Sequence, residues 1–282
     1  MKTYLVPIDF SDASINAAGF AAELSKQTTV ENIILLNAYY VSPIETLLPN
    51  SDMVQLFEEE VEQNVADRIT KLYHLRDKLS KKVRAGVQIS IHLNRSHLLR
   101  AVVENVFIKN ADLVILGSKG NSSQSDSDIG SHVVGISKAS PVPVVVVPPN
   151  YSFKNIKRVV VACDFEKVKD TVPLASLKRL LDRKKYELLV VNIDKDSRHL
   201  AGDAGREAEE SALYEMLAPY KPRYSYVNNT DVINGILQFA TDNDAQLVIA
   251  LPHKYSFFQS LLHDSVSQQL AASSAVPVLL LK

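Results

Sequence analysis

The feature of this sequence that most constrains its fold is an internal repeat. Two segments late in the first copy recur 134 residues further on, Asn110–Leu116 as Asp244–Ala250 and Ser140–Val146 as Ser274–Leu280. Two early segments recur 155 residues further on, Val6–Phe10 as Val161–Phe165 and Leu36–Ala38 as Val191–Ile193. The difference between the two offsets, 155 and 134 residues, places a 21-residue insertion in the first copy. A chain of 282 residues built in this way is expected to form two domains of one fold, residues 1–148 and 155–282, joined around Pro148–Tyr151.

Each copy alternates predicted strands with predicted helices. The strands are short runs rich in β-branched residues, typical of strands buried on both faces of a parallel sheet. In the first copy they span Tyr4–Ile8, Asn32–Tyr39, Val87–Leu93, Leu113–Leu116 and Pro141–Val147. In the second copy they span Val159–Cys163, Tyr186–Ile193, Tyr224–Val227, Leu247–Leu251 and Val276–Leu281. This alternation predicts an α/β fold of two tandem doubly wound parallel five-stranded sheets with right-handed crossovers.

The helices between the strands follow from apolar spacing and from capping residues. Ser11 or Asp12 is expected to cap the first helix. The small face of that helix is expected to pack closely on the sheet, and it consists of Ala17, Ala18 and Ala21. Apolar residues from Phe57 to Leu79 predict a long helix, with Gly86 as its C-terminal stop. Further helices are expected at Ser96–Lys109 and Val232–Asn243.

Composition excludes several classes of function. Lys and Arg number 31 against 32 Asp and Glu, and the net charge of −1 lacks the basic excess that nucleic-acid binding requires. No apolar stretch reaches the roughly 18 residues that span a membrane. The single cysteine, Cys163, excludes an intramolecular disulfide framework and favours the cytoplasm. Because Cys163 aligns with Ile8 at the end of a strand, a buried and unreactive thiol is favoured over a nucleophile.

A glycine motif in the first copy carries the strongest functional signal. Gly117 and Gly120 follow a predicted strand, and Gly130 and Ser131 come after nine further residues, at the head of the last helix. Glycines allow close approach to the backbone, and free N–H groups at a helix start attract anions, so the pattern could cradle phosphates. In a doubly wound sheet the ligand crevice lies beyond the carboxyl ends of the strands, where Asp9 and the pair Asn37 and Ala38 should also emerge.

At this point the whole chain resembles a tandem universal stress protein. The resemblance is carried by Val6–Ser11, Ala111–Gly117, the G-x2-G-x9-G-S spacing and the closing Pro141–Val144. It implies the adenine nucleotide alpha hydrolase-like fold, with strand order 3-2-1-4-5, and ATP bound together with Mg²⁺ in the first domain. By this resemblance Asp9 would contact the ribose or a nearby phosphate, Pro7 would shape the pocket floor, and Ala38 would meet adenine through its backbone. Leu116 would bound the pocket, and the phosphates would be held by Gly117, Gly120, Gly130, Ser131 and the N–H of His132.

A second interpretation of the glycines is that they serve only a tight turn between strand and helix. The span between them contains Asp126 and Asp128, where the family usually has apolar and basic residues. A carboxylate about 4 Å from a phosphate charge costs on the order of 4 kcal/mol at an effective dielectric of 20, unless Mg²⁺ lies between them. Both interpretations stay open on the sequence.

The second copy has lost the motif. The gapless register places Leu251, Lys254 and Asp264 where the first copy has its glycines, and only Ser265 is retained. We therefore expect no ATP binding of the family's kind in this domain. Its His253 and His263, beside Asp264, are either metal ligands or ordinary loop residues, with nearby apolar side chains that pack the pocket shut or bind an apolar ligand.

The leading hypothesis is a regulatory nucleotide-binding protein without catalysis, because no general base or nucleophile is positioned by the motif and any ATP hydrolysis would be slow and incidental. The alternative is a scaffold or interaction protein that binds no nucleotide. An enzyme is disfavoured because the Ser-Gly-Gly pyrophosphate loop and a G-x-G-x-x-G fingerprint are absent from the sequence. The apolar strands Pro141–Val147 and Val276–Leu281 are expected to pair within one chain as an internal pseudo-dimer, and a further homodimer is compatible with this arrangement.

Overall fold

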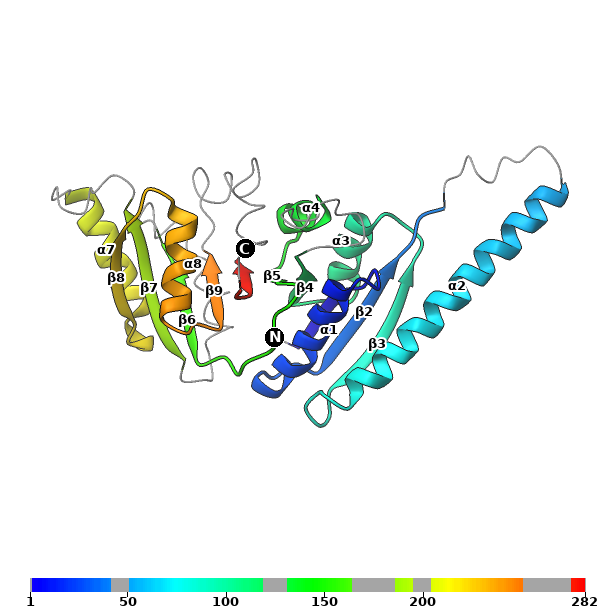
Figure 1. The fold of residues 1–282 in the computed structure, drawn as a ribbon, viewed down its shortest axis with the longest axis horizontal. Helices are drawn as coiled ribbons and strands as arrows, with labels where there is room; N and C mark the ends of the chain where they lie inside the picture. Colours follow the sequence, from blue (N-terminus) through cyan, green and yellow to red (C-terminus); the bar gives the residue numbers. More distant parts are fainter. Residues whose placement is uncertain are drawn as a thin grey trace.

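The computed structural model describes residues 2–41, 51–118, 131–163, 186–194, 204–250 and 275–281 (Figure 1). The first unit contains β1 (Thr3–Pro7), α1 (Asp12–Leu24), the 3-10 helix η1 (Ser25–Gln27), β2 (Asn32–Ala38), α2 (Ser51–Ser80), β3 (Gln88–Asn94), α3 (Leu98–Ile108), β4 (Leu113–Gly117), α4 (Ser131–Ala139) and β5 (Val144–Val147). The second unit contains β6 (Arg158–Ala162), β7 (Glu187–Asp194), α7 (Ala204–Leu217), the 3-10 helix η4 (Ala218–Tyr220), β8 (Arg223–Asn228), α8 (Val232–Asp242), β9 (Leu247–Ala250) and β10 (Val278–Leu280).

The strands form one ten-stranded sheet in the order β3-β2-β1-β4-β5-β10-β9-β6-β7-β8. Within each unit the strands are parallel and follow the order third, second, first, fourth, fifth. The predicted doubly wound α/β fold and its strand order are thus confirmed. The units meet where β5 and β10 pair antiparallel, with Val146 opposite Val278 and Val144 opposite Leu280.

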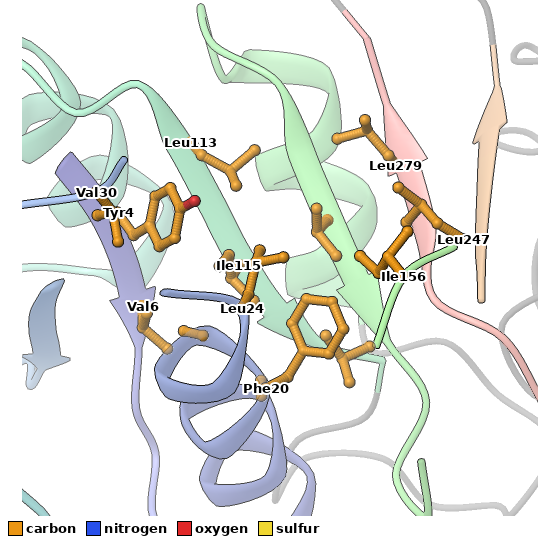
Figure 2. Packing of buried hydrophobic residues seen from close by; sticks show 14 of the residues in the cluster. Tyr4, Val6, Phe20, Leu24, Val30, Leu113, Ile115, Ile156, Leu247 and Leu279 are labelled. Carbon is orange, nitrogen blue, oxygen red and sulfur yellow. The ribbon is translucent and has the colours of Figure 1, made fainter. Parts of the chain in front are cut away.

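Alternation along the strands divides the core between the two faces of the sheet. Tyr4 and Val6 of β1 face α1 and α2, whereas Leu5 faces α3 and α4. The core on the α1 side runs on into the second unit, where Ile156, Leu247 and Leu279 join it (Figure 2). Among the described helices, none combines the length and apolar character that crossing a bilayer requires.

Helix α1 begins and packs as its residues predict. The Ser11 hydroxyl accepts a hydrogen bond from the Ser14 N–H at 3.2 Å, which makes Ser11 the cap. The predicted small face is buried, with exposed fractions of 0% for Ala17, 1% for Ala18 and 0% for Ala21. Small side chains let α1 lie close to the sheet, and at the carboxyl end of β4 the backbone of α1 comes so near that Gly117 has no room for a side chain.

Two local predictions are corrected by the structure. Gly86 does not stop α2, which ends at Ser80; its φ of +86° serves a turn in which the Val87 N–H donates to the Arg84 carbonyl at 3.1 Å. Cys163 is only partly buried. The reason is that β6 ends at Ala162, so Cys163 already lies at the carboxyl edge of the sheet rather than inside it.

The segment that joins the units is docked on α1. The Asn16 side-chain amide donates to the carbonyls of Pro148 and Tyr151 at 3.0 and 3.1 Å. The Phe20 ring packs edge to face against Tyr151 and Phe153, with centroids 6.0 and 5.4 Å apart. The side chain of Gln27 accepts from the Ile156 N–H at 2.8 Å. The connection is therefore an ordered part of the first unit's surface.

Both units fasten the start of their first strand with one side chain. In the first unit Asp112 accepts hydrogen bonds from the N–H groups of Lys2 and Thr3 at 2.7 and 3.0 Å. In the second unit Gln246, its counterpart in the repeat, accepts from the N–H groups of Lys157 and Arg158, both at 2.9 Å. The duplicated copies keep this contact although the residue type differs.

Candidate functional site

The sequence predicts a ligand crevice at the carboxyl edge of the first unit, and the strands that meet there are β1 and β4. β1 pairs with β2 through all of its residues to Pro7, but its pairing with β4 covers only Tyr4 and Leu5. The ladder between β1 and β4 therefore stops two residues before β1 ends. Strand order also reverses here, with β2 on one side and β5 on the other, which is the position where doubly wound sheets bind ligands.

Five of the predicted site residues lie along this edge. Pro7 is buried at the end of β1, and Leu116 is buried at 4% exposure near the end of β4. Ala38 ends β2 opposite Asn94 and is partly exposed, as are Asp9 beyond β1 and Gly117 at the end of β4. The expected convergence of strand ends is therefore present for the described residues.

Asp9 is held in a tight turn between β1 and α1. Its Oδ1 accepts hydrogen bonds from the Ser11 N–H at 3.0 Å and the Ser11 hydroxyl at 2.5 Å, while its own N–H donates to Ser14 Oγ at 3.4 Å. Between them Phe10 adopts a φ of +64°, a left-handed conformation that costs a non-glycine residue roughly 1–3 kcal/mol. The strained conformation of Phe10 is part of the turn that holds the Asp9 carboxylate next to Ser11, at the start of α1.

A polar side chain that the sequence places at this edge, Asn37, ties β1 to β2. Asn37, exposed by only 1%, donates to the Ile8 carbonyl at 2.6 Å, and its Oδ1 accepts from Arg68 Nη1 of α2 at 3.1 Å. In the second unit Asn192 donates to the Cys163 carbonyl at 2.8 Å. The repeat shows this position in the sequence, since an Asn follows an apolar run in both strands, as Asn37 in β2 and Asn192 in β7.

Gly117 has a packing reason to be glycine. A Cβ at this position would lie 2.6 Å from both the carbonyl carbon and the carbonyl oxygen of Ala13. No side chain fits at that distance without moving the backbone of α1. Gly117 therefore supports the interpretation in which a glycine serves the junction of strand and helix, and it leaves its backbone as the group available to a ligand.

Aromatic and cationic side chains surround the ends of β2 and β3. The rings of Tyr40 and His97 are stacked, with centroids 3.8 Å apart and planes 22° apart. Arg68 lies 5.9 Å from the Tyr39 ring centroid, and Lys71 lies 5.9 Å from the centroid of Phe10. Lys71 is also paired with Asp67 at 2.6 Å, so the aromatic rings at this edge stand beside one paired cation and beside Arg68.

Several predicted residues fall outside the described part of the chain. These are Gly120, Gly130, Asp126 and Asp128 in the first unit, and Leu251, His253, Lys254, His263, Asp264 and Ser265 in the second. Ser131 is the first residue of α4, so the backbone N–H of the next residue, His132, lies in the first turn of the helix. The side chain of His132 is exposed. Within the described residues there is no group of three or more His, Cys, Asp or Glu side chains placed to hold a metal ion.

Comparison with known proteins gives a family and a fold. The family model described as Universal stress protein family matches the chain twice, at residues 1–148 and 155–282. No curated protein matches the chain. The structure is similar to that of a universal stress protein from Archaeoglobus fulgidus DSM 4304, with a TM-score of 0.64 and 18% identity over 99% of this chain and 96% of that one.

A second similar structure is the functionally unknown protein PA1789 from Pseudomonas aeruginosa PAO1. Its TM-score is 0.59, with 12% identity over 100% of this chain and 92% of that one. At such identities the likeness concerns the fold, and both chains share it along nearly their whole length.

Proposed function

Since the chain belongs to the universal stress protein family, we propose that it is a regulatory protein that binds an adenine nucleotide, specifically ATP, in its first domain, residues 1–148. The observation that carries the proposal is that the ladder between β1 and β4 stops before β1 ends, with Asp9 fixed in the turn that follows β1. The G-x2-G-x9-G-S spacing continues directly from this edge.

In the proposed complex each site residue has one task. Asp9 meets the ribose or a nearby phosphate, Pro7 and Leu116 bound the pocket, and the Ala38 backbone meets adenine. The phosphates lie against the backbone of the glycine motif and the first turn of α4, at residues Gly117, Gly120, Gly130, Ser131 and His132. A Mg²⁺ ion between the phosphates and Asp126 or Asp128 would offset the repulsion between their negative charges.

We further propose that the second domain, residues 155–282, binds no ATP. By the register of the repeat it has Leu251, Lys254 and Asp264 in place of the glycines, and Asp264 would put a negative side chain where phosphate should sit. The role left to this domain is assembly: the pairing of β5 with β10 would hold the chain as an internal pseudo-dimer in solution, and any homodimer would form through other surfaces. A single cysteine fits a place in the cytoplasm.

The proposed protein is not an ATPase of ordinary turnover. Asp9 Oδ1 already accepts two hydrogen bonds from Ser11, which hold the carboxylate in a structural turn and occupy an oxygen that a general base would use. Binding would act through conformation or partner choice, and hydrolysis would be slow and incidental.

A scaffold that binds no nucleotide is the second candidate. It is favoured by Gly117, whose identity follows from its contact with Ala13 whether or not a ligand binds. It is also favoured by the acidic residues Asp126 and Asp128 in the motif span.

Mass spectrometry of nucleotides released from freshly purified protein separates the two candidates. We expect ATP from the wild type and none from Gly130→Asp, a substitution that places in the first domain the residue found at position 264 of the second. Gly117 is unsuitable for this test, because its substitution disturbs α1 directly. ATP released equally from both proteins would contradict the proposed site, and none from either would favour the scaffold.

A further inference from the structure

Helix α2 is much longer than its counterpart in the second unit. It has 30 residues, whereas α7, which takes the same place in the repeat, has 14 described residues. Figure 1 shows α2 beyond β3, at the outer end of the sheet, with its first turns continuing past the strands. Leu72, Leu75 and Leu79 are buried, but no residue from 58 to 67 is buried. The first half of α2 therefore adds little to the core of its own unit.

The two flanks of α2 face different surroundings. On one flank Arg68 donates to Asn37 at 3.1 Å, and Lys71 lies 5.9 Å from the ring centroid of Phe10, so this flank faces the first unit. With 3.6 residues per turn, a second set of residues lies together on the other flank. We call this set the outer face of α2, and it consists of Glu62, Val65, Ile69, Tyr73 and Arg76. Glu62 and Tyr73 are exposed, and the other three are partly exposed.

The outer face of α2 has the same spacing in both directions along the helix. The steps between its residues are three, four, four and three, so Ile69 is its centre. Suppose that two such helices pack antiparallel around a two-fold axis at Ile69. Val65 of one copy then meets Tyr73 of the other, and Glu62 meets Arg76. A symmetric contact needs a surface that is complementary to itself, and this face is apolar in the middle and oppositely charged at its two ends.

Charge along the whole helix is divided in the same way. Residues 58–67 contain five acidic side chains and no basic one, whereas residues 68–80 contain four basic side chains and one acidic. The helix dipole favours such a bias only in the first and last turns. Glu62 lies about three turns inside α2, so the dipole does not account for it. In an antiparallel pair the acidic half of one copy lies along the basic half of the other, which favours a second copy of this chain over a partner of one charge sign.

Arg76 has neighbours in its own chain and still has donors for a further contact. Its guanidinium carbon lies 4.6 Å from the centroid of the Tyr73 ring, which places the charge beside the apolar middle of the outer face. It also pairs with Asp77 at 2.8 Å. An exposed pair of this kind contributes little to stability, and a guanidinium has five N–H donors, so a second carboxylate can bind it as well.

We propose that the outer face of α2 is a homodimer interface, on which a second copy of this chain packs its own α2 antiparallel. The contact from Glu62 to Arg76 is about 21 Å long. It is smaller than a standard interface of about 1,600 Å², so we expect a weak dimer with a Kd in the micromolar range. This contact is separate from the pairing of β5 with β10 inside the chain, and it does not depend on nucleotide binding.

Charge reversal tests the contact without disturbing the core, because the charged ends of the outer face are not buried. Glu62→Arg places an arginine against Arg76 of the second copy, and Arg76→Glu places a glutamate against Glu62. Each repulsion occurs twice in a symmetric dimer. Sedimentation velocity of the full chain at about 1–100 µM protein should show that the wild type dimerises. In about 50 mM salt each single variant should dimerise about tenfold more weakly or less, and the double variant should dimerise as the wild type does.

An equal mixture of the two single variants tests the antiparallel arrangement. Glu62→Arg has a basic residue at both ends of the outer face, and Arg76→Glu has an acidic residue at both ends. The mixture should therefore form heterodimers although neither variant forms homodimers well. Glu60→Arg and Lys78→Glu are the matched controls, because they make the same charge changes at exposed positions of α2 off the outer face. Both controls should dimerise as the wild type does, and circular dichroism checks that all variants keep the fold.

The opposite results overturn the inference. A wild-type chain that stays monomeric at about 100 µM has no such interface. Dimerisation that is equal in the wild type and both single variants would place the interface elsewhere, such as the open edge of β3 or β8. Equal losses in the single variants and the controls would assign the effect to overall charge, and a mixture without heterodimers would exclude antiparallel pairing.

Discussion

The side-chain amide of Asn37 donates to the carbonyl of Ile8 at 2.6 Å, at the point where β1 leaves the sheet. The second unit repeats the contact between Asn192 and Cys163 at 2.8 Å, although it has lost the glycines of the motif. A contact kept by both copies belongs to the fold. The glycine motif is kept by one copy and lost by the other, so the fold does not require it in both units.

Replacing Asn37 by Ala should destabilise the protein by about 1–3 kcal/mol. The substitution leaves the buried Ile8 carbonyl unpaired and removes the partner of Arg68, and an unsatisfied buried group carries the full desolvation cost. Urea denaturation followed by circular dichroism measures the change. Asn192→Ala should show a loss of similar size, whereas a change below about 0.5 kcal/mol for both variants would mean that the contact is incidental.

Replacing Gly117 and replacing Gly19 by Ala should change the stability of the protein in opposite directions. Gly117→Ala should destabilise by about 1–3 kcal/mol or more, because the new Cβ would lie 2.6 Å from backbone atoms of Ala13. Gly19→Ala, in the middle of α1 with nothing within 4 Å of its Cβ, should stabilise by about 0.5–1 kcal/mol through helix propensity. Thermal unfolding compares the two, and a tolerated Gly117→Ala would show that α1 moves easily away from β4.

Stability should fall at alkaline pH because of buried tyrosines. Burial raises the pKa of Tyr4 above its ordinary value of 10 and raises that of Tyr224 to about 12. The folded state therefore keeps its phenol protons to higher pH than the unfolded state, so stability is complete below pH 10 and is lost as pH rises above it.

The variants Tyr4→Phe and Tyr224→Phe test whether these two tyrosines cause the loss of stability at alkaline pH. Each should reduce the slope of stability against pH above 10. At pH 7 Tyr4→Phe should lose about 1 kcal/mol, because its hydroxyl donates to Thr28 at 2.8 Å. Tyr224→Phe should lose little, since its buried hydroxyl has no partner among the described residues. Denaturant titrations at pH 7 to 11 measure the free energy of unfolding of each variant. If its slope against pH were identical to that of the wild type, the two tyrosines would not be the cause of the alkaline loss of stability.

The linker should become cleavable when its contact with α1 is removed. Asn16→Ala leaves the carbonyls of Pro148 and Tyr151 without the side-chain donor that fixes them. Limited proteolysis should then cut between residues 148 and 157 several-fold faster, since opening of this segment costs less. Lys26→Ala, at the end of the same helical segment and paired with nearby Glu23, is the control that should leave the rate unchanged.

The sequence was enough to predict the architecture because the information was local and duplicated. Alternating β-branched runs and helical spacing identify βαβ units, and the offsets of the repeat identify two copies. Ser11, Ala17 and Ala21 illustrate why: a cap and a small helix face depend on neighbours in the chain. The strand order came from family resemblance, and the structure has it in both units.

What the sequence could not predict depends on distant partners. Asn37 in an apolar run gives no sign that it will meet Ile8 and Arg68, residues on two other elements. Gly117 was assigned to a phosphate, and its contact with Ala13 appears only when α1 is packed on β4. Gly86 fits a helix stop by residue type, but α2 already ends at Ser80.

The central claim is that one domain of the pair binds ATP and the other does not. Isothermal titration of the wild-type chain with ATP and Mg²⁺ tests it most directly through the stoichiometry. The account predicts one ATP per chain and none in Gly130→Asp. Two ATP per chain, or no heat at millimolar ATP, would contradict it.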